Sequence, residues 1–290
     1  MRGRYTRLLI FYTEDNLRDL ATADMGLMDG TFKIVSRLFD QLYTVHGYMD
    51  PTTLLLVYRL MSRRTQLGYQ CLLHELADTA AGMGLDLNPS TVVTDFELAA
   101  INAVRIEFPS SNVHGCFFHF GQTLWRRVQH EGLAGLYKDD VCDFGIKVRQ
   151  LAAMAFLSPH DVREAYLHLK SMFPPEALNF LMWFEEMYVL GRPRRHVLSD
   201  GPPVVVRAVP TFPPPMWNVS SLVEEGQPRG NNSVEAWHRR WVTIVNCNHV
   251  SVYRMINAMK DKQQSAEDAR EARVRGQPPP PKRERQREYE

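Results

Sequence analysis

Three acidic residues spread along the chain have the side chains and the sequence surroundings to bind a hard divalent cation. Asp29 lies in the strand-like run LMDGTFK, Asp95 ends the strand-like run STVVTD, and Glu235 lies at the start of a helical pattern. Ligands of α/β sheets gather at such strand ends. Two carboxylates on adjacent strands repel unless a cation lies between them. Carboxylate oxygens suit Mg²⁺, and a third acid would complete a site for two ions about 3.5–4 Å apart that promote phosphoryl displacement.

Each acid also has a structural interpretation. Asp29 precedes Gly30, a pair that is common in turns, and Asp95 could cap the helix that follows it. Glu235 follows Asn232 at the spacing of a capping box. Glu97 is a further carboxylate, at a position where acids commonly begin helices. Taken singly, the acids are therefore weak evidence for a site.

Short β-branched and aromatic runs alternate with helical patterns over residues 25–132. The order is three strands, a helix, a strand, a helix, a strand and a helix, which predicts an α/β fold whose mixed sheet joins antiparallel strands to parallel crossovers. The expected strands are 27–35, 41–49, 52–62, 90–97 and 112–120, and the expected helices are 69–84, 98–108 and 122–132.

The remaining segments differ in character from this core. Residues 1–24 form a mixed, polar lead-in, and 133–190 read as an all-helical insertion without strand signals. Residues 191–230 are rich in proline and are expected to be an irregular return segment. The pattern of residues 231–262 predicts a final helix, from Ser233 to about Lys262. Residues 263–290 are rich in charge and proline and are expected to be a disordered tail.

Composition restricts the classes of partner and compartment. The 290 residues carry a formal net charge of +1, so any nucleic-acid surface must be a local basic patch. No apolar run approaches the ~20 residues that a membrane span needs, and no membrane partner is expected. The four cysteines are widely scattered, which is unlike a disulfide framework and favours a reducing, intracellular location.

Four longer motifs occur in a fixed order: DGTFK, TDFE, GCFFHFGQTLWRRVQ and NNSVEAWHRRW. This ordered set closely resembles the transposase domain of Mutator-like elements (MULE), a family of DDE transposases, from about Met25 to Lys260. The resemblance implies a ribonuclease H-like core with a helical insertion before the last catalytic helix. It implies that Asp29, Asp95 and Glu235 are catalytic and hold two Mg²⁺ (or Mn²⁺) ions. It also implies that the substrate is double-stranded DNA, which is cleaved at transposon ends and joined to target DNA in the nucleus.

Cysteine and histidine residues near these acids suggest accessory roles. Cys116 and His119 form the C-x2-H element of the family, which is half of a zinc site; the alternative is a buried cysteine beside a hydrogen-bonded histidine. The spacings of His114, His238, Cys247 and His249 do not select further zinc ligands. His238, one turn after Glu235, could orient a carboxylate or contact a phosphate, or it could face solvent.

Basic residues flank the same motifs and are candidates for DNA contact. They are Lys33, Arg126, Arg127, Arg239 and Arg240. The arginine pairs adjoin Trp125 and Trp241, as suits phosphate contact with nearby base stacking. Alternatively, the tryptophans pack in the core while the arginines face solvent. The tail sequence KRERQR suits a nuclear-import signal or a solvated tail.

Departures from the family pattern leave a second function open. Gly230 and Ala236 stand where the family usually has threonine and glycine, and no zinc-containing DNA-targeting module precedes the core. On this pattern we expect a fragment, a degenerate copy, or a domesticated, catalytically silent derivative that acts as a DNA- or protein-binding module. The presence of all three acids favours retained chemistry. The sequence leaves open whether the chain forms a homo-oligomer.

Overall fold

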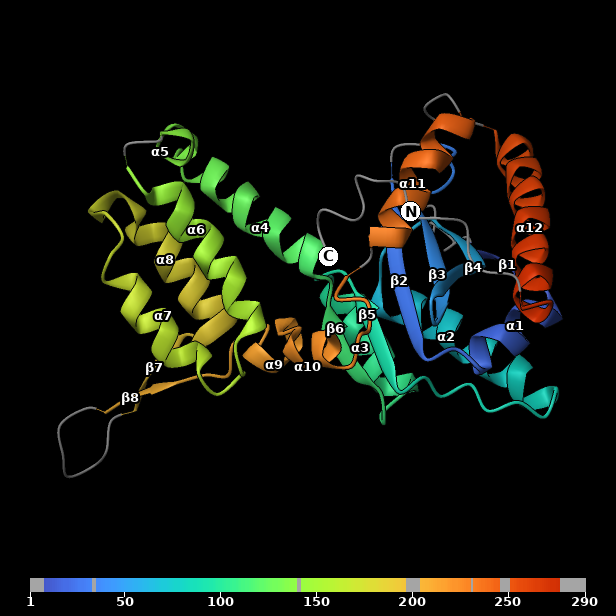
Figure 1. Cartoon of the computed structure of the whole chain (residues 1–290), viewed down its shortest axis with the longest axis horizontal. Coiled ribbons are helices and arrows are strands. Elements are labelled where there is room, and N and C mark those ends of the chain that lie inside the picture. The colour runs from blue at the N-terminus through green and yellow to red at the C-terminus, as the bar shows by residue number, and fades with distance from the viewer. Residues whose placement is uncertain are drawn as a thin grey trace, which may run out of the picture. The chain divides into compact units, whose positions relative to one another are not determined.

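A six-stranded sheet forms the centre of the fold. The computed structural model describes residues 8–32, 35–139, 142–196, 204–230, 232–245 and 251–276. The strands are β1 (Leu8–Phe11), β2 (Met25–Thr31), β3 (Gln41–Met49), β4 (Thr52–Met61), β5 (Thr91–Thr94) and β6 (Asn112–Gly115). Their order is β1-β4-β3-β2-β5-β6 (Figure 1), and the β2–β3, β3–β4 and β1–β4 pairs are antiparallel. This mixed α/β sheet confirms the predicted class and is compatible with a ribonuclease H-like core.

Two helices bury apolar side chains against one face of the sheet. They are α11 (Asn232–Val245) and α12 (Val252–Val274). The shared cluster includes Leu42, Tyr58 and Leu60 from β3 and β4, together with Trp237, Trp241, Met255 and Met259 from the helices. Trp237 and Trp241, one turn apart, stack with ring centroids 5.0 Å apart. Because strand side chains alternate between faces, Tyr58 and Leu60, two positions apart on β4, both reach this cluster.

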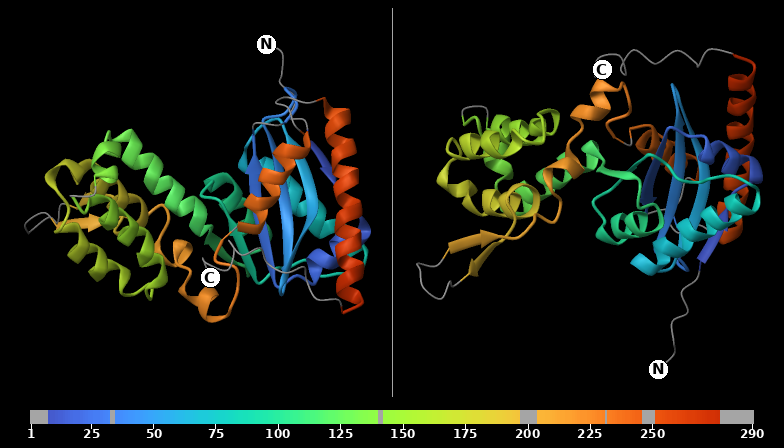
Figure 2. Two further views of the ribbon diagram at one scale, coloured as in Figure 1. Left: turned by 45° about the horizontal axis from the view of Figure 1, so that its top comes forward. Right: turned by 90° about the horizontal axis from the view of Figure 1, so that it is seen from below.

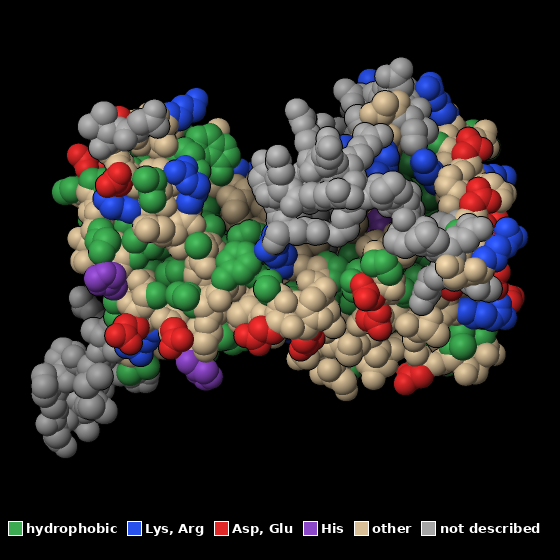
Figure 3. All heavy atoms as spheres, viewed as in Figure 1, with side chains coloured by type: hydrophobic (Ala, Val, Ile, Leu, Met, Phe, Trp, Pro, Cys, Tyr) green, Lys and Arg blue, Asp and Glu red, His purple; other side chains and the backbone are tan. Residues whose placement is uncertain are grey.

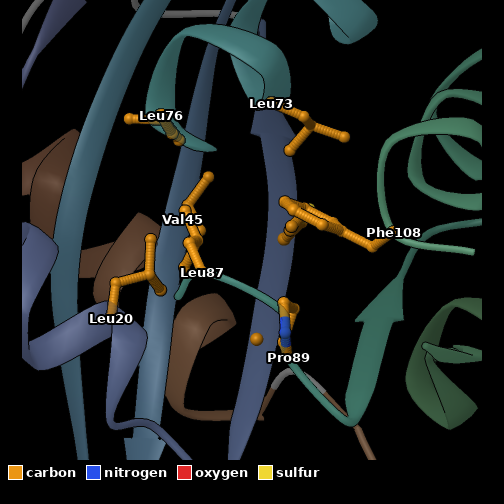
Figure 4. Close-up of a pocket in the computed structure, with 9 residues that line it drawn as sticks. Leu20, Val45, Leu73, Leu76, Leu87, Pro89 and Phe108 are labelled. Atoms are coloured by element: carbon orange, nitrogen blue, oxygen red, sulfur yellow. The ribbon is translucent and has the colours of Figure 1, made fainter. Parts of the chain in front are cut away.

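The opposite face packs against α2 (Gln66–Gly82) and the neighbouring elements. α2 begins at Thr65, whose hydroxyl caps it by accepting the Gly68 N–H at 3.1 Å. Between the helix and the sheet remains a cavity of about 10 Å³, lined by apolar side chains that include Val45, Leu73, Leu76 and Phe108 (Figure 4). A cavity of this size holds about one water, and its apolar lining keeps it dry. It is a packing defect, not a ligand site.

The chain divides into two compact units. The first comprises the described parts of Met1–Val92, Glu97–Asn112 and Asn232–Glu290, including α1 (Glu14–Ala21) and α3 (Leu98–Glu107). The second comprises Val93–Phe96 and Val113–Asn231. Figure 2 shows the elements of both units from two further directions.

Helices make up most of the second unit. Those from Phe117 to Val189 are α4 (Phe117–His130), α5 (Ala134–Lys138), α6 (Phe144–Ala153), η1 (Met154–Phe156), α7 (Val162–Lys170), η2 (Pro175–Ala177), α8 (Leu178–Phe184) and η3 (Glu185–Val189). Hydrophobic side chains are exposed on several of them (Figure 3), among them Leu167, Leu178 and Met182. Their buried core is aromatic: the Phe120 ring stacks on Trp217 with centroids 4.9 Å apart.

Several boundaries differ from those expected from sequence. Residues 8–21, within the expected lead-in, form β1 and α1, and β1 is part of the sheet. The expected strand 112–120 ends at Gly115, because Phe120, Leu124 and Val128 recur at helical spacing and bury one face of α4. The expected irregular segment 191–230 contains the hairpin β7 (Pro193–His196) and β8 (Val204–Arg207), then α9 (Pro214–Trp217) and α10 (Ser220–Glu224).

The expected single helix from Ser233 to about Lys262 is instead the pair α11 and α12. Both helices bury side chains in one cluster on the sheet, which a single straight helix of this length cannot do. α12 also extends twelve residues into the expected tail, to Val274. Its Arg270 pairs with Asp15 and Asp19 of α1 at 3.0 and 2.8 Å, which holds the helix in place. Residues 277–290, including KRERQR, lie outside the described residues.

None of the helices in the described ranges combines the length and apolar character of a membrane span. Cys71, Cys116 and Cys142 take part in no disulfide among the described residues.

Candidate functional site

The Asp29 carboxylate is buried in the middle of the sheet. Asp29 pairs with Thr44 across the β2–β3 ladder, so it lies within a strand and the turn interpretation is wrong. Its side chain is 2% exposed, and its Oδ1 accepts the N–H of Gly30 at 2.7 Å. Burying a carboxylate is costly unless hydrogen bonds or a cation compensate. Asp29 is therefore placed as a functional carboxylate would be.

His238 of α11 contacts this carboxylate. Its Nδ1 lies 3.3 Å from Oδ2 of Asp29, and its Nε2 lies 3.4 Å from the hydroxyl of Thr44. The His238 side chain is buried on the face of α11 that covers the sheet, so the solvent-facing alternative is wrong. The structure thus brings together two residues that the sequence analysis named separately.

A second histidine lies behind this contact. His46, two residues after Thr44 on β3, places its Nε2 3.1 Å from the Thr44 hydroxyl. Burial, with a smaller contribution from the charge of His238, holds the pKa of His46 well below its usual value, so His46 is neutral. Sequence reasoning missed Thr44 and His46. The available signal was two polar residues at alternate positions, on one face of an otherwise apolar strand.

Asp95 follows β5 directly and belongs to the second unit, whereas Asp29 belongs to the first. β5 is the neighbour of β2 in the strand order. Asp95 is half-buried, and its Oδ1 lies 3.5 Å from the Thr94 hydroxyl, at the limit for a hydrogen bond. It does not cap α3, because the N-cap residue is Glu97. The helix-cap interpretation of Asp95 is therefore wrong.

The Glu97 carboxylate has interaction partners within the first unit. Its carboxylate lies 3.9 Å from the guanidinium of Arg64. Burial raises the pKa of Glu97, against the opposing effects of a hydrogen bond from Tyr69 and the charge of Arg64. Its contacts are those of a residue that holds the start of α3 against α2.

Glu235 lies in α11, three residues before His238. Its side chain and that of Asn232 are outside the described residues, so the capping box stays a prediction. Lys33, Cys247 and His249 also lie outside them.

Cys116 and His119 lie at the start of α4. Cys116 is the buried N-cap residue, and its N–H donates to the carbonyl of Thr94 at 2.8 Å. The position that a Cβ on Gly230 would take is 3.3 Å from the Cys116 sulfur, so Gly230 allows the chain to approach this thiol closely. His114 is turned elsewhere, with its Nδ1 3.2 Å from the Asn218 carbonyl. Within the described residues, no group of three or more histidine, cysteine, aspartate or glutamate side chains is arranged to hold a metal.

Some of the arginine candidates for DNA contact are exposed, and another is paired with an acidic side chain. Arg126, Arg239 and Arg240 are exposed. Arg127 instead pairs with Glu131 at 2.6 Å and lies over the ring of Trp183 at 5.2 Å, which indicates a structural role. Trp241 is fully buried, as expected if the tryptophan packs in the core while the neighbouring arginines face solvent.

Comparison with known proteins identifies part of the chain. The family model of the MULE transposase domain matches residues 25–123, from the first residue of β2 into α4. The match includes Asp29, Asp95, Cys116 and His119, and ends before Glu235 and His238. No curated protein matches the chain. Residues 25–123 are therefore similar to the MULE transposase domain.

Proposed function

We propose that this chain is a DDE-type transposase domain that cleaves DNA at transposon ends and transfers the freed strand to target DNA. The observation that carries the proposal is the buried carboxylate of Asp29 within the matched MULE segment. The strand that carries Asp29 neighbours the strand that Asp95 follows. Glu235 is on α11, whose His238 contacts Asp29.

Asp29, Asp95 and Glu235 would hold Mg²⁺ or Mn²⁺. Their carboxylate oxygens fit a hard cation, which prefers oxygen ligands. When bound, two such ions would stabilise the attacking and leaving oxygens of an in-line displacement. The protein's own task is to hold the three carboxylates in place and to bind the DNA backbone beside them.

Two displacements at phosphorus make up the proposed reaction. In the first, a water oxygen bonds to phosphorus, the bond to the 3′ oxygen breaks, and a 3′-hydroxyl and a 5′-phosphate result. In the second, that 3′ oxygen attacks a phosphodiester of the target and displaces its 3′ oxygen. Each step replaces one phosphorus–oxygen bond by another, so no covalent intermediate with the protein is needed.

Further parts of the proposal concern the insertion and the surroundings of the domain. We propose that the helices from α5 to η3 are the insertion that precedes the last catalytic helix, and that the partner is double-stranded DNA in the nucleus. Cys116 and His119 would belong to a zinc site only with further ligands from elsewhere. A separate DNA-targeting module and self-association would complete the active assembly.

The test is nicking of duplex DNA that carries the sequences flanking the gene, with Mg²⁺ or Mn²⁺. We expect wild type to nick this DNA, and Asp29→Asn, Asp95→Asn and Glu235→Gln each to lower the rate by at least about 100-fold. Glu164→Gln, at an exposed position of α7, should retain the wild-type rate. Equal inertness of wild type and all variants, with DNA binding preserved, would instead identify a catalytically silent, domesticated derivative.

A further inference from the structure

A line of buried polar side chains runs from the interior of the first unit to the Asp29 carboxylate. His46 Nε2 lies 3.1 Å from the Thr44 hydroxyl, which lies 3.4 Å from His238 Nε2; His238 Nδ1 lies 3.3 Å from Asp29 Oδ2. All four residues are at most 7% exposed. Buried polar networks of this kind order the groups at their ends when each member has a partner.

We propose that His238 is a positioning residue for the Asp29 carboxylate, held in its orientation by Thr44 and His46. This inference rests on the proposed function, in which Asp29 is ionised and holds a cation. An ionised carboxylate only accepts hydrogen bonds. The proton in the contact with Asp29 therefore belongs to His238, at Nδ1.

Two contacts restrict the Asp29 carboxylate. Oδ1 accepts the Gly30 N–H at 2.7 Å, and Oδ2 lies at ion-pair distance, 3.3 Å, from His238 Nδ1. A carboxylate that is contacted at both oxygens loses rotational freedom. Groups that orient a metal ligand in this way typically contribute 10–100-fold to metal affinity or activity.

Thr44 fixes the other side of the imidazole ring. Its hydroxyl lies close to His238 Nε2 and also 3.3 Å from the Asp29 carbonyl oxygen, to which it can donate. The neutral His46 donates to the same hydroxyl when its proton is on Nε2. When the Thr44 hydrogen points to His238 Nε2, that nitrogen accepts and the ring proton is on Nδ1, toward Asp29.

Aromatic contacts seat α11 on the sheet at the same place. The Trp237 ring lies edge-on to His46, with centroids 5.8 Å apart, and is tilted against Tyr58 at 6.0 Å. Residue 235 is one turn before His238, on the same side of the helix. The His238–Asp29 contact thus links the orientation of the Asp29 carboxylate to the packing of α11, the helix that carries Glu235, against the sheet.

The first experiment measures the protonation of the histidine rings in the metal-free full chain. Long-range ¹H–¹⁵N correlation spectra distinguish protonated from bare ring nitrogens, and the signals missing from His238→Asn assign His238. We expect a protonated Nδ1 for His238. A bare Nδ1 with the proton on Nε2 alone would overturn the inference, whether or not the protein is a nuclease.

The second experiment measures Mn²⁺ affinity by electron paramagnetic resonance. Thr44→Val removes the hydroxyl at nearly constant volume, and Thr44→Ser retains it. We expect Thr44→Val and His238→Leu to weaken Mn²⁺ binding by about 10–100-fold, and Thr44→Ser to stay within a few-fold of wild type. His168→Asn, at an exposed position of α7, should bind as wild type does.

The outcomes separate the two hypotheses. Wild-type affinity in both Thr44→Val and His238→Leu would overturn the positioning role while leaving the metal site intact. Wild type without Mn²⁺ binding would overturn the proposed function, and the ring protonation alone would then decide whether His238 donates to Asp29. If His238→Leu does not fold, the Thr44→Val and Thr44→Ser pair still decides the comparison.

Discussion

The Glu185 carboxylate on η3 lies 2.6 Å from the guanidinium of Arg207 on β8 and also pairs with Lys170 of α7. Glu185 is 6% exposed, whereas both cations are about one-third exposed. The buried acid therefore connects three elements of the second unit through its charge.

Replacing Glu185 by glutamine should destabilise the second unit by about 1.5–3 kcal/mol at pH 7, the range for hydrogen bonds to charged groups. Burial alone would raise the pKa of Glu185, but the hydrogen bond and charge of Lys170 and the charge of Arg207 lower it below 4.5. A lowered folded-state pKa stabilises the fold above pH 4.5, and this contribution is lost as the pH falls below that value.

Urea unfolding at pH 7 and pH 3, followed by tryptophan fluorescence, checks this prediction. The difference between wild type and Glu185→Gln should shrink at pH 3. Glu176→Gln, at an exposed position, is the control and should change stability by less than about 0.5 kcal/mol. A difference that is equally large at both pH values would contradict the charge-based explanation.

Replacing Arg59 by methionine should leave stability unchanged or raise it by up to about 3 kcal/mol. Arg59 of β4 is fully buried, and its Nε, Nη1 and Nη2 have no hydrogen-bond partner among the described residues. Replacing buried charged groups by apolar residues of similar volume is often neutral or stabilising. Burial lowers the pKa of Arg59 from its ordinary value to about 10, so the cost of burying its charge is present below pH 10 and is relieved as the pH rises above that value.

Native-state hydrogen exchange of the β3 and β4 amides measures this effect locally. Arg63→Met, at the exposed end of the same segment, should leave their protection unchanged. A clear loss of protection in Arg59→Met would mean that the guanidinium has a stabilising partner.

Gly191→Ala should be much more destabilising than Gly226→Ala, although both glycines have a left-handed backbone, with φ of 76° and 68°. A Cβ on Gly191 would clash with the Ala208 carbonyl oxygen, whereas none of the described atoms lies within 4 Å of one on Gly226. The backbone conformation costs about 1–2 kcal/mol in both, and the clash adds about 1–3 kcal/mol at Gly191. Hydrogen exchange of α8 and η3 should show this difference; equal losses would contradict the contact.

Replacing Arg239 and Arg240 together by glutamine should weaken binding to a short DNA duplex and reduce its salt dependence. Each phosphate contact that is lost lowers the slope of log affinity against log salt by about 0.9. Fluorescence anisotropy over a KCl series measures this slope. Arg163→Gln, also exposed, is the control; an unchanged slope in the double variant would place the DNA on another surface.

The sequence determined the features that depend on local pattern. The β-branched and aromatic residues of 41–49 and 52–61 predicted β3 and β4, because these residue types suit a pleated, half-buried strand. The order of short motifs identified the MULE transposase domain, since a motif can be read without knowing what it contacts. The same local signals failed at helix ends: nothing within 233–262 indicated that the chain reverses between α11 and α12.

Only the tertiary structure decided which residues meet. Thr44 and His238 are 194 positions apart, and their contact depends on how α11 packs against β2 and β3. The turn interpretation of Asp29 and the solvent-facing interpretation of His238 stayed open until their burial was known. Burial and long-range contacts are set by the packing of elements distant in sequence, and no local spacing records them.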